Sequence, residues 1–157
     1  MKPNPYAADL GSRDPLEAFA ETPGRIRQMV ERWEDGRFER SYSAGKWSAR
    51  QILIHLAQTE LALGARVRFA LTQPGYQAQS FDQDQWLPVD SSVDARTAVD
   101  VYTTLRSLNS AMFRSLTPAQ RERTFQHPEY GELSVEWVLR QMAGHDIHHL
   151  KQLEAVA

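Results

Sequence analysis

Apolar side chains recur every three or four residues along much of this chain, which is the spacing of one face of an α-helix. The clearest segment, from about Val93 to Leu116, carries an apolar stripe of Ala98, Val101, Tyr102, Leu105, Leu108, Met112 and Leu116. Three other segments share this period: Ser12 or Asp14 to Trp33, Ser48 to Leu71, and Ser134 to Glu154. No segment alternates convincingly between apolar and polar residues, as a half-buried strand would. The pattern therefore predicts an all-α protein whose four main helices form a bundle.

Capping residues and helix breakers predict where these helices begin and end. Ser48 and Ser134 are suitable N-caps for the second and last helices. Pro15 stands early in the first helix, where its missing N–H costs little. The Pro23-Gly24 pair predicts a kink in that helix or its division into two. Gln73-Pro74-Gly75 ends the second helix.

The segments between the helices are predicted to be irregular. Residues 1–12 form a lead-in with two prolines and Gly11. Segments 34–45, 76–90 and 124–133 are expected to be loops, because they show no helical period. Thr117-Pro118 predicts one extra helical turn after the third helix. The whole chain, residues 1–157, is predicted to be one domain, since its length is that of a single domain.

Composition excludes several classes of function. The formal net charge of −2 gives no basic surface for nucleic acid. No apolar run is as long as the roughly 18–20 residues that a membrane helix needs, and the first residues lack the apolar stretch of a secretory signal. The chain has no cysteine, which excludes disulfides, thiolate nucleophiles and zinc sites built on cysteine. A cytoplasmic protein that acts on a small molecule is the expectation.

The histidines of the last helix are the most informative polar residues. At about 100° per residue, His149 lies about 40° from His145, and both stand at the margin of the apolar face. Residues four apart are neighbours on a helix surface, so these two imidazoles can reach one metal ion. His148 lies about 60° to the other side, beside Gln141 and Lys151, and is expected outside the pair.

His55 has a similar position on the second helix. It lies at the edge of an apolar arc, in line with Thr59 and Arg66. Three imidazoles at the edges of apolar faces suit a pocket between helices, where they could hold zinc, nickel, copper or iron and leave a coordination position open. The spacing alone does not show that residue 55 lies near residue 149 in space. A single histidine at a helix edge is usually a hydrogen-bonded boundary residue.

A metalloprotease motif is a second interpretation of the same residues. The stretch His145–His149 is similar to His-Glu-x-x-His, with Asp146 in place of the general-base glutamate. Aspartate is one methylene shorter, which would misplace the base. A third ligand would have to come from Leu150–Ala157, where Glu154 is too near on the same helix. The protease interpretation is rejected.

The chain resembles the DinB/YfiT-like superfamily of metal-dependent enzymes. Two stretches carry the resemblance: residues 45–58, in which Trp47-Ser48 opens a helix bearing a His-Leu-Ala step, and residues 144–153, with the pattern His-x-x-His-His-Leu-x-Gln. Helix order and the His-Pro-x-x-Gly loop at 127–131 also agree, so the likeness spans nearly the whole chain.

This resemblance implies an up-down-down-up four-helix bundle with a divalent ion, nickel or zinc, on His55, His145 and His149. It also implies a homodimer and, in some members, transfer of a low-molecular-weight thiol onto an electrophile. A divalent ion can lower the pKa of a bound thiol as it does that of water, so thiol transferase and hydrolase activities need the same ligands. The alternative is a metal-binding stress-response protein or dimerising scaffold without turnover.

Other side chains are weaker candidates. Glu60 lies in an apolar sector and needs a partner, which is expected to be an arginine, with support of a metal ligand as the alternative. Asp146 is expected on a solvated helix surface, with orientation of an imidazole as the alternative. Gln152 is a candidate for contact with metal-bound water or substrate, although it could be a polar rim residue. Three loop aromatics, Phe81, Trp86 and Tyr130, are expected to anchor their loops to the bundle or to line a pocket mouth. His127 is expected to be exposed.

Overall fold

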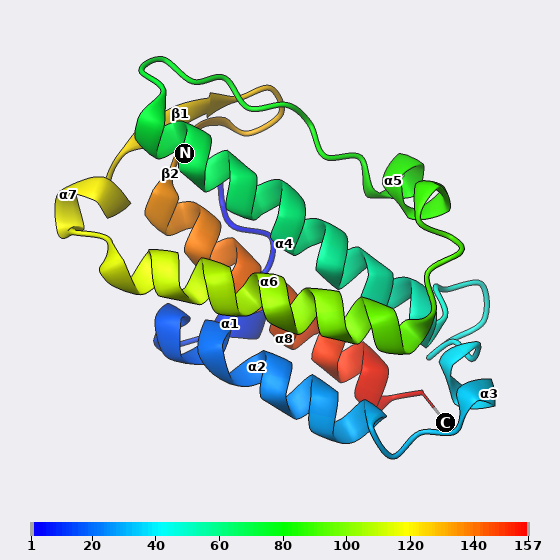
Figure 1. Ribbon diagram of the computed structural model, residues 1–157. Coiled ribbons are helices and arrows are strands. Elements are labelled where there is room, and N and C mark those ends of the chain that lie inside the picture. Colours follow the sequence, from blue (N-terminus) through cyan, green and yellow to red (C-terminus); the bar gives the residue numbers. More distant parts are fainter. Residues whose placement is uncertain (1, 157) are drawn as a thin grey trace.

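Four long helices form the body of the protein in the computed structural model, which describes residues 2–156 (Figure 1). They are α2 (Pro15–Val30), α4 (Ala49–Thr72), α6 (Ala95–Ser115) and α8 (Val135–Glu154). Helix α4 packs against α6 and α8, and α2 packs against the same two helices. Figure 1 shows α2 and α8 running in one direction and α4 and α6 in the other, which confirms the up-down-down-up bundle. Met1 and Ala157, the two ends of the predicted domain, lie outside the described residues.

The predicted helix starts are confirmed at three places. Ser48 accepts a hydrogen bond from the Gln51 N–H, and the Gln51 side chain accepts one from the Ser48 N–H, which forms a capping box at the start of α4. Ser134 accepts from the Trp137 N–H at the start of α8. The extra turn is α7 (Pro118–Arg121), and Thr117 caps it.

The predicted division into two helices at Pro23-Gly24 is wrong, because α2 runs through Pro23 without interruption, whereas the predicted kink stays a prediction. A proline inside a helix leaves the carbonyl four residues earlier without its usual donor. Here that carbonyl belongs to Phe19, and the Arg106 guanidinium of α6 donates to it at 2.7 Å. A tertiary contact thus replaces the hydrogen bond that Pro23 removes.

Short elements occupy segments that were predicted to be irregular. Helices α1 (Ala7–Leu10), α3 (Asp35–Phe38) and α5 (Gln83–Val89) are too short to produce a recognisable apolar period, although Asp82 caps α5. Strands β1 (Thr124–His127) and β2 (Gly131–Ser134) pair antiparallel, with Phe125 opposite Leu133 and both buried. The expectation of no strands is therefore wrong in this segment, because four-residue strands give too little alternation to detect.

The apolar core has two clusters, and a buried polar layer lies between them along the helices. One cluster includes Ile26, Ile52 and Tyr102, and the other includes Phe19 and Phe113. Between the two, the long helices place buried polar residues, among them Glu60, Arg106, Asp146 and the three candidate metal ligands. Among the described residues, no helix is long and apolar enough to cross a membrane.

Candidate metal centre

Three buried histidines from two helices meet in the polar layer. Helix α4 supplies His55, and α8 supplies His145 and His149, one turn apart. The His145 Nε2 lies 2.8 Å from the Nε2 of His55 and 3.0 Å from that of His149. The ligand atoms of all three lie within 4.8 Å of one another, and the residues are 2%, 5% and 6% exposed. The structure therefore brings together the three positions singled out from the sequence.

The electrostatic environment keeps two of these imidazoles neutral. Burial lowers the pKa of His55 well below its usual 6.5, and the nearby His145 and His149 lower it further. Burial likewise lowers the pKa of His149 well below 6.5, with His145 adding to the effect. Neutral imidazole has the lone pair that a metal ion requires.

The convergence of the three Nε2 atoms fits a metal ion better than a hydrogen-bonded histidine cluster. Gln152 Oε1 accepts from the His149 Nδ1–H at 2.7 Å, which places the His149 proton on the outer nitrogen and leaves its Nε2 as an acceptor. A single N–H on His145 could not donate to both neighbours at once. Tetrahedral zinc with Zn–N bonds of about 2.0–2.1 Å would hold its nitrogens about 3.3 Å apart, close to the spacing seen.

A buried charge network backs the histidines. Arg106 of α6 pairs with Glu60 at 2.5 Å and with Asp146, whose Oδ1 lies 3.7 Å from the His145 Nδ1. Tyr102 donates to Asp146 at 3.0 Å, and Asn109 donates to Glu60 at 2.9 Å. The predicted arginine partner of Glu60 is confirmed. The predicted solvation of Asp146 is wrong, because this side chain is 1% exposed and bound by α6.

A pocket of about 370 Å³ opens beside the triad. His55 and His145 form part of its wall, and Tyr6, Phe81 and Tyr130 supply aromatic surfaces. The Phe81 ring is parallel to that of His55 at 6.1 Å, and the Tyr6 ring meets that of His145 edge-on at 5.0 Å. Two of the loop aromatics thus line the pocket, while Trp86 packs on Phe81 at 4.8 Å. The volume is within the usual range for small-molecule sites.

His148 is not one of the three histidines whose ligand atoms converge, although its Nε2 lies 3.0 Å from the Gln152 Nε2. Its Nδ1 lies 3.2 Å from the Asp9 carboxylate on α1, and its side chain is 41% exposed. Gln152 contacts His149 and also donates to the Tyr42 hydroxyl at 3.1 Å. The predicted exposure of His127 is wrong: it is 7% exposed, because β1 turns it toward the pocket.

Several residues of this region were not identified from the sequence. Tyr6 comes from the N-terminal segment, which approaches α8 so closely that a Cβ on Gly144 would lie 2.4 Å from the Tyr6 carbonyl. Tyr102 and Arg106 lie on an ordinary helix, and only the buried carboxylate Glu60 hinted that an arginine was required. Arg66 was noted only as lying in line with His55.

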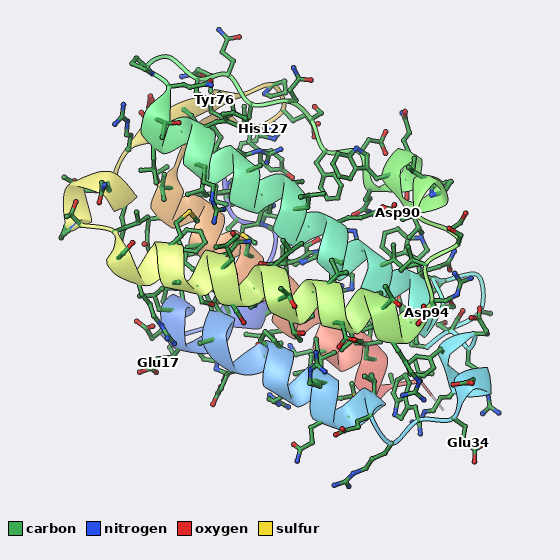
Figure 2. The ribbon with its side chains drawn as sticks, viewed as in Figure 1. Glu17, Glu34, Tyr76, Asp90, Asp94 and His127 are labelled. Carbon is green, nitrogen blue, oxygen red and sulfur yellow. The ribbon has the colours of Figure 1, made fainter. Side chains whose placement is uncertain are left out.

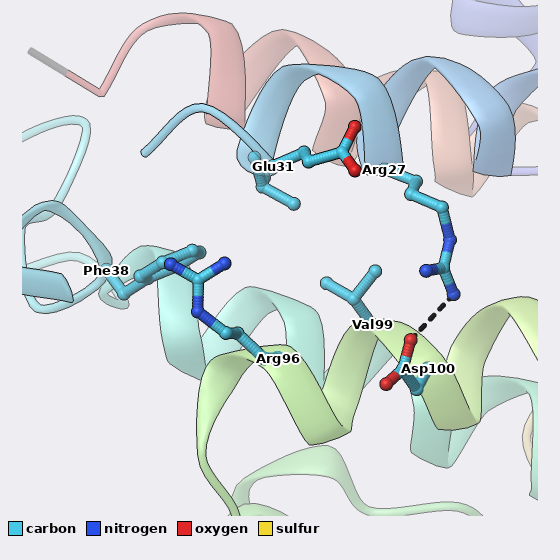
Figure 3. A pocket seen from close by; sticks show the side chains of 7 residues that line it. Arg27, Glu31, Phe38, Arg96, Val99 and Asp100 are labelled. Carbon is cyan, nitrogen blue, oxygen red and sulfur yellow. Dashed lines mark hydrogen bonds and ion pairs between the residues drawn. The ribbon is translucent and has the colours of Figure 1, made fainter. Parts of the chain in front are cut away.

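Another cavity, of about 210 Å³, lies between α2 and α6 (Figure 3). Arg27 and Asp100 form an ion pair of 2.7 Å at its edge, and the Arg96 guanidinium stands over the Phe38 ring at 5.6 Å. Both of its arginines have carboxylate partners, Arg27 in Asp100 and Arg96 in Asp35, and the histidine triad lies elsewhere. The chemistry of the molecule is therefore concentrated in the pocket beside the triad.

Comparisons with known proteins agree with this arrangement. A sequence model described as the DinB superfamily matches residues 18–153. OB0782 of Oceanobacillus iheyensis, whose name describes a metal-dependent hydrolase, is 26% identical over 142 residues, covering 90% of this chain and 83% of the relative. YfiT of Bacillus subtilis, with the same kind of name, is 26% identical over 141 residues, covering 88% and 79%.

Two solved structures share the fold. YfiT of Bacillus subtilis, described as having an unusual four-helix bundle topology, superimposes with a TM-score of 0.83 at 26% identity and covers 90% of this chain and 83% of that one. A mycothiol-dependent maleylpyruvate isomerase superimposes with a TM-score of 0.75 at 14% identity, covering 96% and 63%. The second likeness extends to the fold alone.

Proposed function

The chain belongs to the DinB superfamily, and we propose that it is a divalent-metal-dependent enzyme acting on a small molecule, with His55, His145 and His149 as ligands of the ion. The observation that carries the proposal is the convergence of three buried Nε2 atoms beside a pocket. Nickel or zinc suits an all-imidazole site, and three protein ligands leave a position for another molecule. We treat the whole chain as one such domain, as its length predicts.

The residues around the triad have distinct roles in this proposal. An ion held here would act as a Lewis acid that lowers the pKa of a bound water or thiol. Gln152 orients the His149 ring through its Nδ1–H, and Asp146 stands behind His145. Phe81 and Tyr6 cover the imidazoles from the pocket side, which limits the access of bulk water.

Hydrolysis is the first candidate reaction, because the relatives at 26% identity are named as metal-dependent hydrolases. Thiol transfer is the second candidate. Glu60 and Asp146 are both paired with Arg106, so neither carboxylate is free to take a proton from an incoming nucleophile. Water or a thiol bound to a metal ion would have a lowered pKa and would lose its proton without such a base, so the paired carboxylates are compatible with both reactions. Product analysis with simple esters, and with a thiol plus an electrophile, distinguishes the two.

The rival is a metal-binding scaffold without turnover. The homodimer expected from the family resemblance belongs to both hypotheses, and exposed apolar side chains on α4 and α6 are available for it: Leu61, Phe69, Val101 and Leu108. The cytoplasmic location also stays a prediction. A pocket with an accessible position next to the triad favours the enzyme over the scaffold.

Metal content, measured by elemental mass spectrometry on purified untagged protein, tests the ligand set. We expect about one zinc or nickel per chain, and near-zero metal in His55→Ala and His149→Ala, because two imidazoles bind far more weakly than three. His148→Ala is the matched control and should retain most of the metal, because His148 is not one of the converging ligands and Gln152 keeps its contacts with His149 and Tyr42. If the wild-type protein stays metal-free after incubation with zinc and nickel, the enzyme proposal fails and the scaffold hypothesis remains.

A further inference from the structure

We propose that the pocket beside the triad binds an elongated small molecule with a carboxylate, and that Arg66 and His127 bind this carboxylate at the end of the pocket away from the histidines. The inference rests on the proposed function in one respect: the opposite end of the same molecule would meet the metal ion. It specifies the substrate class, a carboxylic acid whose reactive group is separated from the carboxylate by an extended chain.

The pocket follows one face of α4. His55, Thr59, Leu63 and Arg66 are spaced by four, four and three residues, so they share that face, and all four line the pocket. Arg66 follows His55 by eleven residues, which is about 16 Å along the helix axis. Residues of the hairpin line the far end, and Figure 2 shows His127 at that end of the bundle, opposite to the end with Asp90 and Asp94.

Arg66 is a buried cation whose charge has no carboxylate partner among residues 2–156. The residue is 7% exposed, and its guanidinium donates to the Gln79 carbonyl at 2.8 Å. Within residues 2–156, no carboxylate oxygen lies within the 4.0 Å of an ion pair with Arg66, whereas Arg106 has two such partners. Burial lowers the pKa of Arg66, even though Tyr76 and Glu129 act to raise it. A bound anion would therefore stabilise this side chain.

His127 adds a hydrogen-bond donor next to Arg66. Its Nδ1 accepts from the backbone N–H groups of Glu129 at 3.2 Å and Tyr130 at 3.4 Å, so the proton of the neutral ring is on Nε2. Burial lowers the pKa of His127, and the charge of Arg66 lowers it further, which keeps the ring neutral. This end of the pocket thus offers the charged guanidinium of Arg66 and one neutral N–H donor.

The charge balance favours a carboxylate over a phosphate. Glu129 also lines the pocket, and its carboxylate accepts from the Ser80 hydroxyl at 2.8 Å. Arg66 and the nearby Lys2, whose ammonium donates to the Glu129 carbonyl, stand against the single carboxylate of Glu129. This net single positive charge suits a planar monoanion, which the guanidinium matches, better than a dianion. The carboxylate of Glu129 should weaken the binding of any anion, so its removal should increase the affinity for an anion, whereas removal of Arg66 should decrease it.

The middle of the pocket has polar groups that the protein does not satisfy. Thr59 Oγ1 and Gln141 Oε1 are buried, and neither has a hydrogen-bond partner among the described residues. Both side chains line the pocket between the triad and Arg66. A hydroxyl or amide group along the chain of the bound molecule would satisfy them, because unpaired buried polar atoms are costly.

The test uses linear mercapto acids of three to ten carbons and the mercapto alcohols of the same length, with the thiol as the metal-binding end. Calorimetry on zinc-loaded protein measures each dissociation constant. We expect the acid to bind about tenfold or more tightly than its alcohol at the best length, because a carboxylate can form a bidentate ion pair with a guanidinium and an alcohol cannot. Arg66→Met should abolish that ratio and leave the alcohol affinity unchanged, while Glu129→Gln should increase the ratio. The exposed Arg114→Met of α6 is the matched control and should retain it.

Equal affinities for acid and alcohol in the wild-type protein would overturn the inference, as would an unchanged ratio in Arg66→Met. Inorganic phosphate that displaces the acid at the acid's own concentration would overturn the assignment to a carboxylate. Metal-free protein gives an independent measurement with linear dicarboxylates and the matching diols. Dicarboxylate binding that needs Arg66 supports the anion site even if no metal binds, so failure of the metal proposal and failure of this inference are distinguishable.

Discussion

Arg106 determines how the buried charges of this protein are arranged. Its guanidinium pairs with Glu60 and Asp146, donates to the Phe19 carbonyl freed by Pro23, and stands 3.6 Å over the Phe19 ring. The side chain is 3% exposed, and the two carboxylates raise its pKa despite burial, which by itself lowers it. One side chain therefore pairs with two carboxylates and supports an unbroken α2.

Arg106→Met should lower the free energy of unfolding by about 3–5 kcal/mol, because it leaves Glu60 and Asp146 buried without a cation. Urea denaturation followed by circular dichroism measures this change. Arg27→Met is the matched control, since its ion pair with Asp100 is exposed and should contribute less than about 1 kcal/mol. Equal losses in the two variants would contradict the importance of the buried network.

Gln152 is predicted to act through His149. Gln152→Leu removes the acceptor of the His149 Nδ1–H and should weaken zinc binding about 10- to 100-fold, as loss of a ligand-orienting partner does. A competition titration with a chromophoric chelator measures the affinity. Lys151→Met, which removes only the contact with Asp9, is the control. An unchanged zinc affinity in Gln152→Leu would mean that Gln152 is only a polar residue at the rim.

At the scale of elements, α4 and α6 approach each other closely where α4 has a glycine. A Cβ on Gly64 would lie 2.5 Å from the Asn109 side chain, which donates to Glu60 and accepts from Arg68 at 2.8 Å. The two parallel helices can pack this closely only with a residue that lacks a side chain at this point. The approach also brings Asn109 to the buried Glu60.

Gly64→Ala should destabilise the protein by about 1–3 kcal/mol, because Asn109 must move away from its buried partners. Gly24→Ala in α2 is the matched variant: nothing lies within 4 Å of its Cβ position, so the change should stabilise by about 0.5–1 kcal/mol. Thermal unfolding of the two variants measures the expected loss of stability in Gly64→Ala and the expected gain in Gly24→Ala. Stabilisation by Gly64→Ala would contradict the close packing of α4 and α6.

At the scale of the whole molecule, the stability of the metal-free protein should depend on pH through its buried histidines. The folded pKa values of His55 and His149 lie below the unfolded value of about 6.5, because burial disfavours the charged ring. Between those values the unfolded chain binds more protons than the folded one. Their contribution to stability is therefore full above pH 6.5 and is lost as the pH falls toward the folded pKa values.

We expect the metal-free protein to lose about 2 kcal/mol of stability between pH 7 and pH 5.5, and the metal-loaded protein to release its ion over the same range. Urea denaturation at each pH and elemental analysis after dialysis measure these effects. The double variant His55→Asn, His149→Asn should show a smaller pH dependence. Full metal retention at pH 4 would contradict a site made only of histidines.

The sequence by itself determined the four long helices, most of their caps and the pairing of His145 with His149, because these depend on spacing within one helix. The motif resemblance added the bundle topology and the link to His55. Only the tertiary structure decided the continuity of α2 at Pro23, the short hairpin and the burial of Asp146 and His127. The continuity of α2 and the burial of Asp146 depend on contacts between residues far apart in the chain, such as Arg106 with Phe19, which no local pattern encodes. The hairpin is local, but its four-residue strands alternate too briefly to be detected.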